Sequence, residues 1–299
     1  MSQTKFIKTE DVIFLELVGF TFLLIGAALL WNKTHAQYYV DWQWINPFFI
    51  SAAGMFALYY FFGLWITKTF PYFSIILKSI GMIFLTWMLL PLLNTAAFTT
   101  PVSTLYDVFF NHVDQQMGFH FLRIMQWFEA HPLLNTIAIH IYVDFLFIAL
   151  LFPVILAIAK QEKAVYEYYG SFIILLMLSF TIYYFFPTTS PADVYPHHYF
   201  SATQIHLTHY FQEEHHYQPF HFAMTAIIGF PSLHAGWAVL FSYYLFQYRW
   251  TRWFAVLYLI FIIIAIFPTG WHFLSDIISG VMVALVAIGI SIHLLRARS

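Results

Sequence analysis

The stretch LNTIAIHIYVDFLFIALLFPVILAIA, residues 134–159, decides the class of fold to which this chain belongs. Apart from His140 and Asp144, it carries no charged or imidazole side chain. A helix needs about 20 mostly apolar residues to cross the hydrocarbon core of a bilayer. The stretch meets this requirement, so we predict a membrane-spanning helix here.

The composition of the whole chain agrees with this prediction. Of its 299 residues, 61% are hydrophobic and 9% are charged, and its mean hydropathy is +0.73. Since about a quarter of the residues of a soluble domain are charged, this chain cannot cover its surface with polar groups. We therefore predict an all-α integral membrane protein. The net charge of −2 and the lack of a basic block argue against nucleic-acid binding, and the lack of cysteine excludes disulfides, thiol nucleophiles and thiolate metal sites.

The spanning requirement is met repeatedly along the chain, which predicts a bundle of about eight transmembrane helices. The first apolar segment follows MSQTKFIKTE without a small-residue cleavage site, so we interpret it as a span and not as a removable signal. The predicted spans are residues 11–31, 47–66, 73–93, 134–159, 168–187, 230–248, 251–268 and 272–295.

The basic residues predict how the bundle is oriented. With eight spans both termini share one side, and nine basic residues fall on that side: Lys5, Lys8, Lys68, Lys160, Lys163, Arg249, Arg252, Arg296 and Arg298. Lys33 and Arg123 fall on the other side, and Lys78 lies within the third span, where we expect it to pair with another helix or to snorkel. Because cytoplasmic loops carry the excess of Lys and Arg, the termini are predicted to be cytoplasmic. The connections 94–133 and 188–229 then lie on the periplasmic, extracellular or lumenal side.

Three stretches with polar side chains reach this outer side at the ends of predicted spans. They are FFPTTSP at 185–191, FPSLHAGW at 230–237 and PTGWHFLSDIISG at 268–280. Since each lies at a helix end on the same face, their side chains are predicted to meet near the membrane interface. The candidate site residues in the last two stretches are Ser232, His234, His272 and Asp276.

The chemistry of these residue types suits phosphoryl transfer. His272 and Asp276 are spaced i,i+4 and therefore share one helix face. The carboxylate can bind one imidazole nitrogen and leave the other free as nucleophile or base. Ser232 and the backbone N–H groups of the helix start after Pro231 can bind an anion. With His234 as a proton donor to a departing alcohol, the set predicts transfer of a phosphoryl group.

PSLHAGW, followed by HFLSD and Gly280, resembles the type 2 phosphatidic acid phosphatase superfamily, whose last motifs are similar to Pro-Ser-x-His and His-x-x-x-Asp. The PSLHAG form especially resembles the branch of inositol phosphorylceramide synthases. The resemblance covers about residues 170–295. It implies that His272 forms a phosphohistidine, that Asp276 orients it, and that His234 acts first as general acid and then as general base. It implies a helical core and no metal or other cofactor.

The sequence departs from the family pattern in its cations. The family has a Lys-x6-Arg-Pro motif and an Arg six residues before the nucleophilic His, but this chain has Ile266 there and neither Lys nor Arg just before PTTSP. PTTSP is either a simple turn or a substitute whose hydroxyl groups bind phosphate. Arg123, in the connection 94–133, is a second candidate for balancing the charge. The hydroxyl candidates are Thr188, Thr189 and Ser190.

Two further groups of polar residues have alternative interpretations. His140 and Asp144 are spaced i,i+4, and we favour a buried polar pair between helices over a role in lining the substrate cavity. The segment HLTHYFQEEHHYQPFH, residues 206–221, offers imidazole and carboxylate ligands for a transition metal. Its spacing matches no known site, so we favour an interfacial loop and predict no metal site.

Together these observations predict a membrane enzyme whose partner is a lipid phosphate. Residues 1–133 would form N-terminal membrane helices and an outer interfacial connection, and residues 134–299 a catalytic core with its motifs in 170–295. A phosphatase would pass the phosphoryl group to water, and a transferase would pass a phospho-headgroup to a lipid alcohol such as ceramide or diacylglycerol. The alternative is a non-enzymatic transporter or metal-handling protein that uses the histidines of 206–221. The oligomeric state is left open.

Overall fold

The computed structural model describes residues 7–35, 46–202, 204–206, 208–209 and 228–298, and every regular element in these residues is helical. This confirms the predicted all-α class. The α-helices are α1 (Thr9–His35), α2 (Asn46–Ile66), α3 (Pro71–Phe98), α4 (Asp107–Gln116), α5 (Phe121–Glu129), α6 (Pro132–Ile158), α7 (Glu162–Phe185), α9 (Leu233–Phe246), α10 (Arg252–Ile266) and α11 (Leu274–Arg298). Short 3₁₀ turns are η2 (Pro191–Asp193), η3 (His197–Tyr199) and η4 (Phe267–Thr269).

Among the described residues, 7 helices are long and apolar enough to cross a membrane: α1, α2, α3, α6, α7, α11, and α10 together with η4. The sixth predicted span corresponds to α9, which has 14 residues. At 1.5 Å per residue it extends about 21 Å, less than the roughly 30 Å of a hydrocarbon core. The chain folds as an integral membrane bundle of about eight helices. Because α9 is short, the residues just before it are not helical and can form part of a site inside the bundle.

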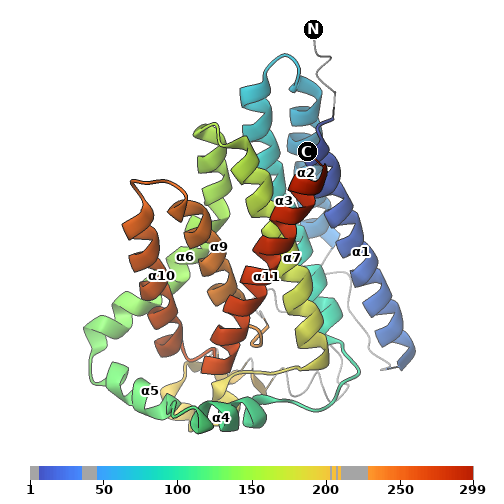
Figure 1. The fold of residues 1–299 in the computed structure, drawn as a ribbon. Coiled ribbons are helices and arrows are strands. Elements are labelled where there is room, and N and C mark those ends of the chain that lie inside the picture. Colours follow the sequence, from blue (N-terminus) through green and yellow to red (C-terminus); the bar gives the residue numbers. More distant parts are fainter. Residues whose placement is uncertain (1–6, 36–45, 203, 207, 210–227, 299) are drawn as a thin grey trace.

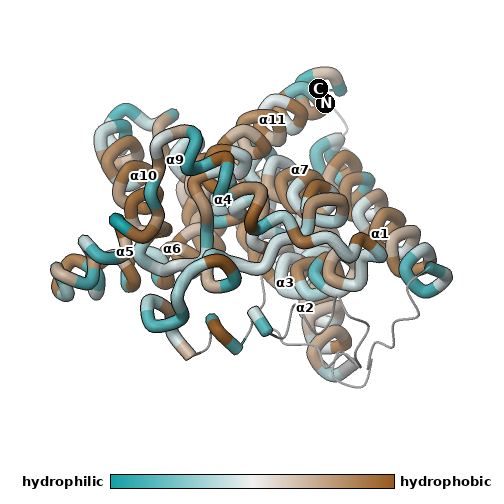
Figure 2. Tube along the Cα trace, turned by 90° about the horizontal axis from the view of Figure 1, so that it is seen from below, coloured by the Kyte–Doolittle hydropathy of each residue, from teal (hydrophilic) through white to brown (hydrophobic). Residues whose placement is uncertain are grey.

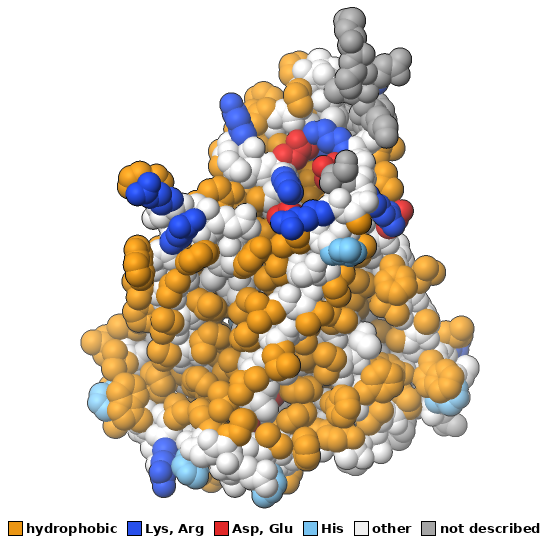
Figure 3. All heavy atoms as spheres, in the orientation of Figure 1, with side chains coloured by type: hydrophobic (Ala, Val, Ile, Leu, Met, Phe, Trp, Pro, Cys, Tyr) orange, Lys and Arg blue, Asp and Glu red, His pale blue; other side chains and the backbone are white. Residues whose placement is uncertain are grey.

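Helix α1 begins and α11 ends at one end of the bundle, and α4 and α5 lie across the other end (Figure 1). Figure 2 views that second end and shows the same two helices crossing it. On the face shown in Figure 3, most Lys and Arg side chains gather at the end that carries the termini, and a hydrophobic belt separates them from the α4 end. This grouping matches the predicted alternation of charges. That the charged end faces the cytoplasm stays a prediction.

A buried ionic cluster attaches the N-terminal helices to the rest of the bundle. The Lys78 Nζ donates to Asp11 Oδ1 at 3.1 Å and to the Tyr166 hydroxyl at 2.6 Å. Tyr60 and Tyr166 donate their hydroxyl hydrogens to Asp11 Oδ1 at 3.0 and 2.5 Å. Because a buried charge needs both a counter-charge and hydrogen bonds, the cluster holds α1, α2, α3 and α7 together. The expectation that Lys78 pairs with another helix is confirmed.

Helices α9 and α11 approach so closely that their contact requires glycine. A Cβ atom added at Gly280 would lie 2.2 Å from the Ser232 carbonyl oxygen, and one at Gly236 would lie 3.1 Å from the Gly280 carbonyl oxygen. The Ser232 N–H donates to the Asp276 carbonyl oxygen at 2.9 Å across the same contact. The start of α9 is thus fixed against the first turns of α11.

We expect the substitution Gly280→Ala to destabilise the protein by about 1–3 kcal/mol, because the added methyl group overpacks a backbone contact. Thermal unfolding in detergent measures this. The matched control on the same helix is Gly289→Ala, whose added Cβ meets nothing within 4 Å and which gains about 0.5–1 kcal/mol of helix stability. Equal unfolding temperatures for the two variants would contradict the close packing of α9 on α11.

Candidate active site

The structure brings together the residues of the two predicted motifs. The imidazole rings of His234 and His272 lie with centroids 5.9 Å apart and an interplanar angle of 60°. His234, His272, Asp276 and Ser232 are all buried, with exposed fractions of 4%, 3%, 1% and 0%. They come from the first turn of α9, the segment before α11 and the first turn of α11. These elements meet at the end of the bundle on which α4 and α5 lie (Figure 1).

The hydrogen bonds of His272 fix its tautomer. Its Nδ1 lies 3.0 Å from the carbonyl oxygen of Gly229. Because a carbonyl oxygen only accepts, Nδ1 carries the proton, and Nε2 keeps its lone pair and can act as a nucleophile. The Asp276 Oδ2 lies 3.5 Å from Nδ1, beyond the usual hydrogen-bond range, and it accepts the Phe273 N–H at 2.8 Å. Gly229, which sequence reasoning did not single out, therefore orients His272 more directly than Asp276 does.

His234 is held from α6 by a residue that sequence reasoning missed. The Tyr142 hydroxyl lies 3.0 Å from His234 Nδ1, and the two rings stack with centroids 4.0 Å apart. The Nε2 of His234 is buried and has no hydrogen-bond partner in the described residues. The nitrogen available for proton transfer is thus Nε2. Tyr142 carries no sequence signal of its own beyond its place among the apolar residues of a span.

Ser232 is the N-cap residue of α9. Its hydroxyl oxygen accepts the Ala235 N–H at 3.3 Å, which satisfies one of the free N–H groups of the first turn. The hydroxyl hydrogen remains available to a ligand. The positive end of the α9 dipole points to the same place.

The PTTSP segment lies beside the residue that holds His272. A Cβ atom at Gly229 would lie 2.7 Å from Thr188 Oγ1, so the two segments are in direct contact. The hydroxyl oxygens of Thr188 and Thr189 are buried and lack a partner in the described residues. By contrast, Ser190 bonds to Thr208 at 3.0 Å and accepts the Ala192 N–H at 3.2 Å. The two threonines are free to bind a ligand, whereas Ser190 stabilises the local turn.

The other predicted residues lie away from the imidazoles. His140 and Asp144 are exposed on α6, and His140 Nδ1 bonds to the Thr136 carbonyl oxygen of its own helix at 2.8 Å. The prediction of a buried pair is therefore wrong. Successive helical residues are 100° apart, so positions two before and two after the buried Tyr142 fall on the opposite face. Arg123 is exposed on α5.

Within the described part of the chain, no Lys or Arg side chain bonds directly to this site. No hydrogen bond or ion pair there joins a Lys or Arg side chain to Ser232, His234, His272 or Asp276. The positive groups at hand are backbone N–H groups, hydroxyl hydrogens and the start of α9.

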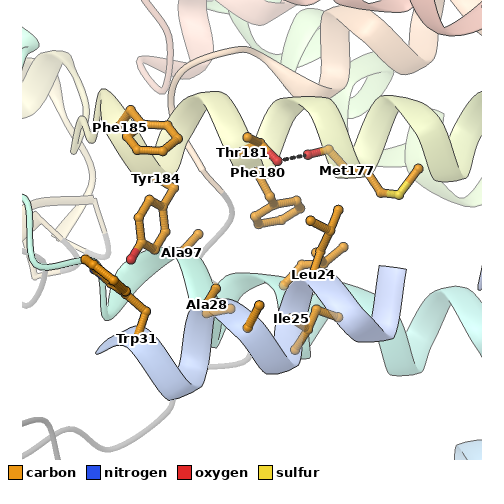
Figure 4. A pocket seen from close by; sticks show the side chains of 13 residues that line it. Leu24, Ile25, Ala28, Trp31, Ala97, Met177, Phe180, Thr181, Tyr184 and Phe185 are labelled. Carbon is orange, nitrogen blue, oxygen red and sulfur yellow. Dashed lines mark hydrogen bonds between the residues drawn. The ribbon is translucent and has the colours of Figure 1, made fainter. Parts of the chain in front are cut away.

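An apolar cavity of about 370 Å³ reaches His234. Its walls come from α2, α3, α6, α7 and α9, and they include Phe48, Trp87, Leu146, Phe172 and Trp237. A second apolar cavity of about 440 Å³ lies between α1, α3 and α7, with Trp31, Phe180 and Tyr184 in its wall (Figure 4). The Thr181 hydroxyl in this second cavity donates to its own helix, to the Met177 carbonyl oxygen at 2.7 Å (Figure 4). Only the first of these two cavities includes a candidate catalytic residue.

The predicted interfacial or metal-binding segment 206–221 lies mostly outside the described residues, which include only positions 206, 208 and 209 of it. Among the residues that are described, no group of three or more His, Cys, Asp or Glu side chains could hold a metal ion. The metal-handling alternative therefore has no described site to support it.

Comparison with known proteins identifies the family to which the chain belongs. No curated protein and no solved structure matches the chain. One family model, described as the PAP2 superfamily, matches residues 109–290, which is more than half of the chain and includes every segment of the site. On this match, the chain belongs to the PAP2 superfamily.

Proposed function

We propose that the protein is a membrane enzyme that removes or transfers the phosphate-containing headgroup of a lipid through a phosphohistidine at His272. Membership of the PAP2 superfamily supports phosphatase-type activity on lipid phosphates in general. The finer steps are our proposal and derive from the geometry of the site.

The observation that carries the proposal is a set of buried polar atoms without partners on the segments that adjoin His272. The Nε2 of His234 and the hydroxyl oxygens of Thr188 and Thr189 have no hydrogen-bond partner in the described residues. Leaving such a group unsatisfied costs about 1–3 kcal/mol, so several on neighbouring segments call for a polar ligand. Two hydroxyl donors and one imidazole suit the oxygens of a phosphate ester.

The proposed reaction has two steps. The Nε2 of His272 attacks phosphorus, and the bond between phosphorus and the alcohol oxygen breaks while His234 gives that oxygen its proton. His234 then takes a proton from water or from an acceptor alcohol, whose oxygen attacks phosphorus and releases His272. The negative charge that develops on the phosphoryl oxygens would be stabilised by the Thr188 and Thr189 hydroxyls and by the N-terminus of α9.

The apolar cavity supports a lipid as the substrate. His234 lies in its wall, and Phe48 and Trp87 extend that wall into α2 and α3. A chain bound there would place its headgroup at the imidazoles and its tail between helices that face the bilayer. The N-terminal part of the chain would then select the lipid tail, while the core performs the chemistry.

The positions of the charges support a site at the non-cytoplasmic face. Helix α11 begins next to His272, at the end opposite its own C-terminal end (Figure 1) and opposite the concentration of Lys and Arg (Figure 3). By the positive-inside rule, the end rich in Lys and Arg faces the cytoplasm.

The test incubates purified protein with a labelled lipid phosphate in chelator, with and without diacylglycerol or ceramide. We expect release of phosphate or formation of a labelled lipid, and little turnover of water-soluble glycerol phosphate, which has no tail for the cavity. Product that forms only with a lipid alcohol identifies a transferase, and product that forms without one identifies a phosphatase. Equal turnover of the lipid and of glycerol phosphate would contradict the lipid-binding role of the cavity.

A further inference from the structure

Helix α4 presents a single buried face to the site. Its buried residues are Asp107, Phe110 and Asp114, spaced i, i+3 and i+7, which places them in one row along the helix. On the opposite face Val108 and Phe109 are 69% and 57% exposed. The helix lies across the end of the bundle where the imidazoles lie (Figure 1, Figure 2).

The first residue of the row holds the PTTSP segment. Both carboxyl oxygens of Asp107 accept the Thr189 N–H, each at 3.0 Å. Just before it, the Tyr106 N–H donates to the Pro187 carbonyl oxygen at 2.9 Å. The start of α4 therefore fixes the backbone that carries the two unpartnered threonine hydroxyls.

The other two residues of the row hold the two histidine segments. The Phe110 ring stacks on Phe230 with centroids 4.1 Å apart, and Phe230 directly follows Gly229, which bonds to His272. Asp114 accepts the Leu274 and Ser275 N–H groups at 2.7 and 3.0 Å. It thus caps α11 from a different helix, midway between His272 and Asp276.

These carboxyl groups are buried, which is costly for a purely structural anchor. The pKa of Asp107 is raised to about 8, chiefly because the carboxyl group is buried; the Thr189 hydrogen bond opposes the rise, and the charges of Asp193 and Asp276 add to it. Burial likewise raises the pKa of Asp114. At pH 7 the raised pKa of Asp107 favours the neutral carboxyl group, which still accepts an N–H and adds little negative charge beside a phosphate. A neutral carboxyl group can accept a hydrogen bond from a backbone N–H and does not repel an anionic substrate bound nearby.

We propose that α4 is a positioning element: Asp107, Phe110 and Asp114 set the distances between the Thr188–Thr189 hydroxyls, the His234 segment and the His272 nucleophile. The inference rests on the proposed function. Each contact reaches a different catalytic segment, so the row acts as a template for the geometry of the transition state. Displacement of a reacting group by about 1 Å lowers a rate by about 10²-fold.

The test compares Asp114→Ala, Asp114→Asn, Asp107→Ala and Asp107→Asn with Glu129→Gln, a control that removes an exposed carboxylate from neighbouring α5. For each protein we measure thermal unfolding, kcat and KM with a lipid phosphate, and inhibition by orthovanadate, which mimics the transition state. We expect kcat to fall about 10–100-fold in the alanine variants. The asparagine variants should recover part of it, because the amide keeps one oxygen acceptor. KM should change less than kcat, and vanadate should inhibit more weakly.

Each other outcome overturns the inference. Variants that match Glu129→Gln in kcat and in vanadate inhibition would show that α4 does not set the geometry. A loss of folded protein with unchanged kcat per folded molecule would show that the aspartates only stabilise the fold. Wild-type protein that neither turns over a lipid phosphate nor binds vanadate would remove the proposed function and, with it, this role of α4.

Discussion

Replacement of His272 by asparagine is expected to lower kcat with a lipid phosphate by about a thousandfold or more, because the substitution removes the nucleophile. The asparagine amide can still donate to the Gly229 carbonyl oxygen, which His272 Nδ1 approaches at 3.0 Å, so the local fold should persist. The assay measures initial rates in detergent or in vesicles. His293→Asn is the matched control, since His293 is exposed on α11, the helix that follows His272.

A direct check is the covalent intermediate. After a brief incubation with a phosphate-labelled lipid and rapid quenching, wild-type protein and His293→Asn should carry label that is stable in base and lost in acid, as expected for a phosphohistidine. His272→Asn should carry none. Label that persists in His272→Asn, or turnover close to that of His293→Asn, would assign the nucleophile to another residue.

The second large effect concerns His234. The substitution His234→Gln is expected to lower kcat for a lipid phosphate by about 10²–10⁴-fold, the usual contribution of a general acid or base. The loss should depend on the leaving group. The leaving group of a nitrophenyl phosphate ester is nitrophenolate, which departs without protonation. The first step, seen as a burst of nitrophenolate, should therefore stay close to the wild-type rate. The second step should stay slow, because a base is still needed to activate water or the acceptor alcohol.

Rapid-mixing measurements separate the two steps. The variant should therefore accumulate the phosphoenzyme with the nitrophenyl ester but form it slowly with the lipid. If both substrates lose the burst to the same extent, His234 does not protonate the leaving group and serves instead to bind or position the phosphate.

The class of fold could be predicted because a bilayer imposes a simple condition on length and hydropathy. The length of α9 could not be predicted from the sequence. Its apolar pattern continues before Leu233, but Ser232 caps the helix there, and the backbone before it makes tertiary contacts with Thr188 and His272. Hydropathy does not distinguish an apolar helix from an apolar segment that builds a site.

The clustering of the candidate residues was predictable where their side chains are close in sequence. His272 and Asp276, and Ser232 and His234, form such pairs. The same logic failed for His140 and Asp144, because i,i+4 spacing indicates a shared face but not which face meets the bundle.

The remaining partners of the site could not be predicted, since they depend on contacts between distant segments. Tyr142 approaches His234 from another helix, and the bonds of Asp107 and Asp114 go to backbone N–H groups. An aspartate in a polar connection between spans gives no sign that it will be buried.

The bond between His272 and Gly229 has a consequence for how this enzyme can vary. The acceptor is main chain, so no replacement of a single side chain can delete it. Position 229 is also closed to larger residues, because a Cβ there would press on Thr188 at 2.7 Å. The tautomer of the nucleophile is thus a property of the path of the backbone. In the proposed mechanism, mutation can change the general acid, the threonine hydroxyls and the apolar cavity one at a time, while His272 Nε2 keeps its lone pair for as long as the backbone of this segment keeps its path.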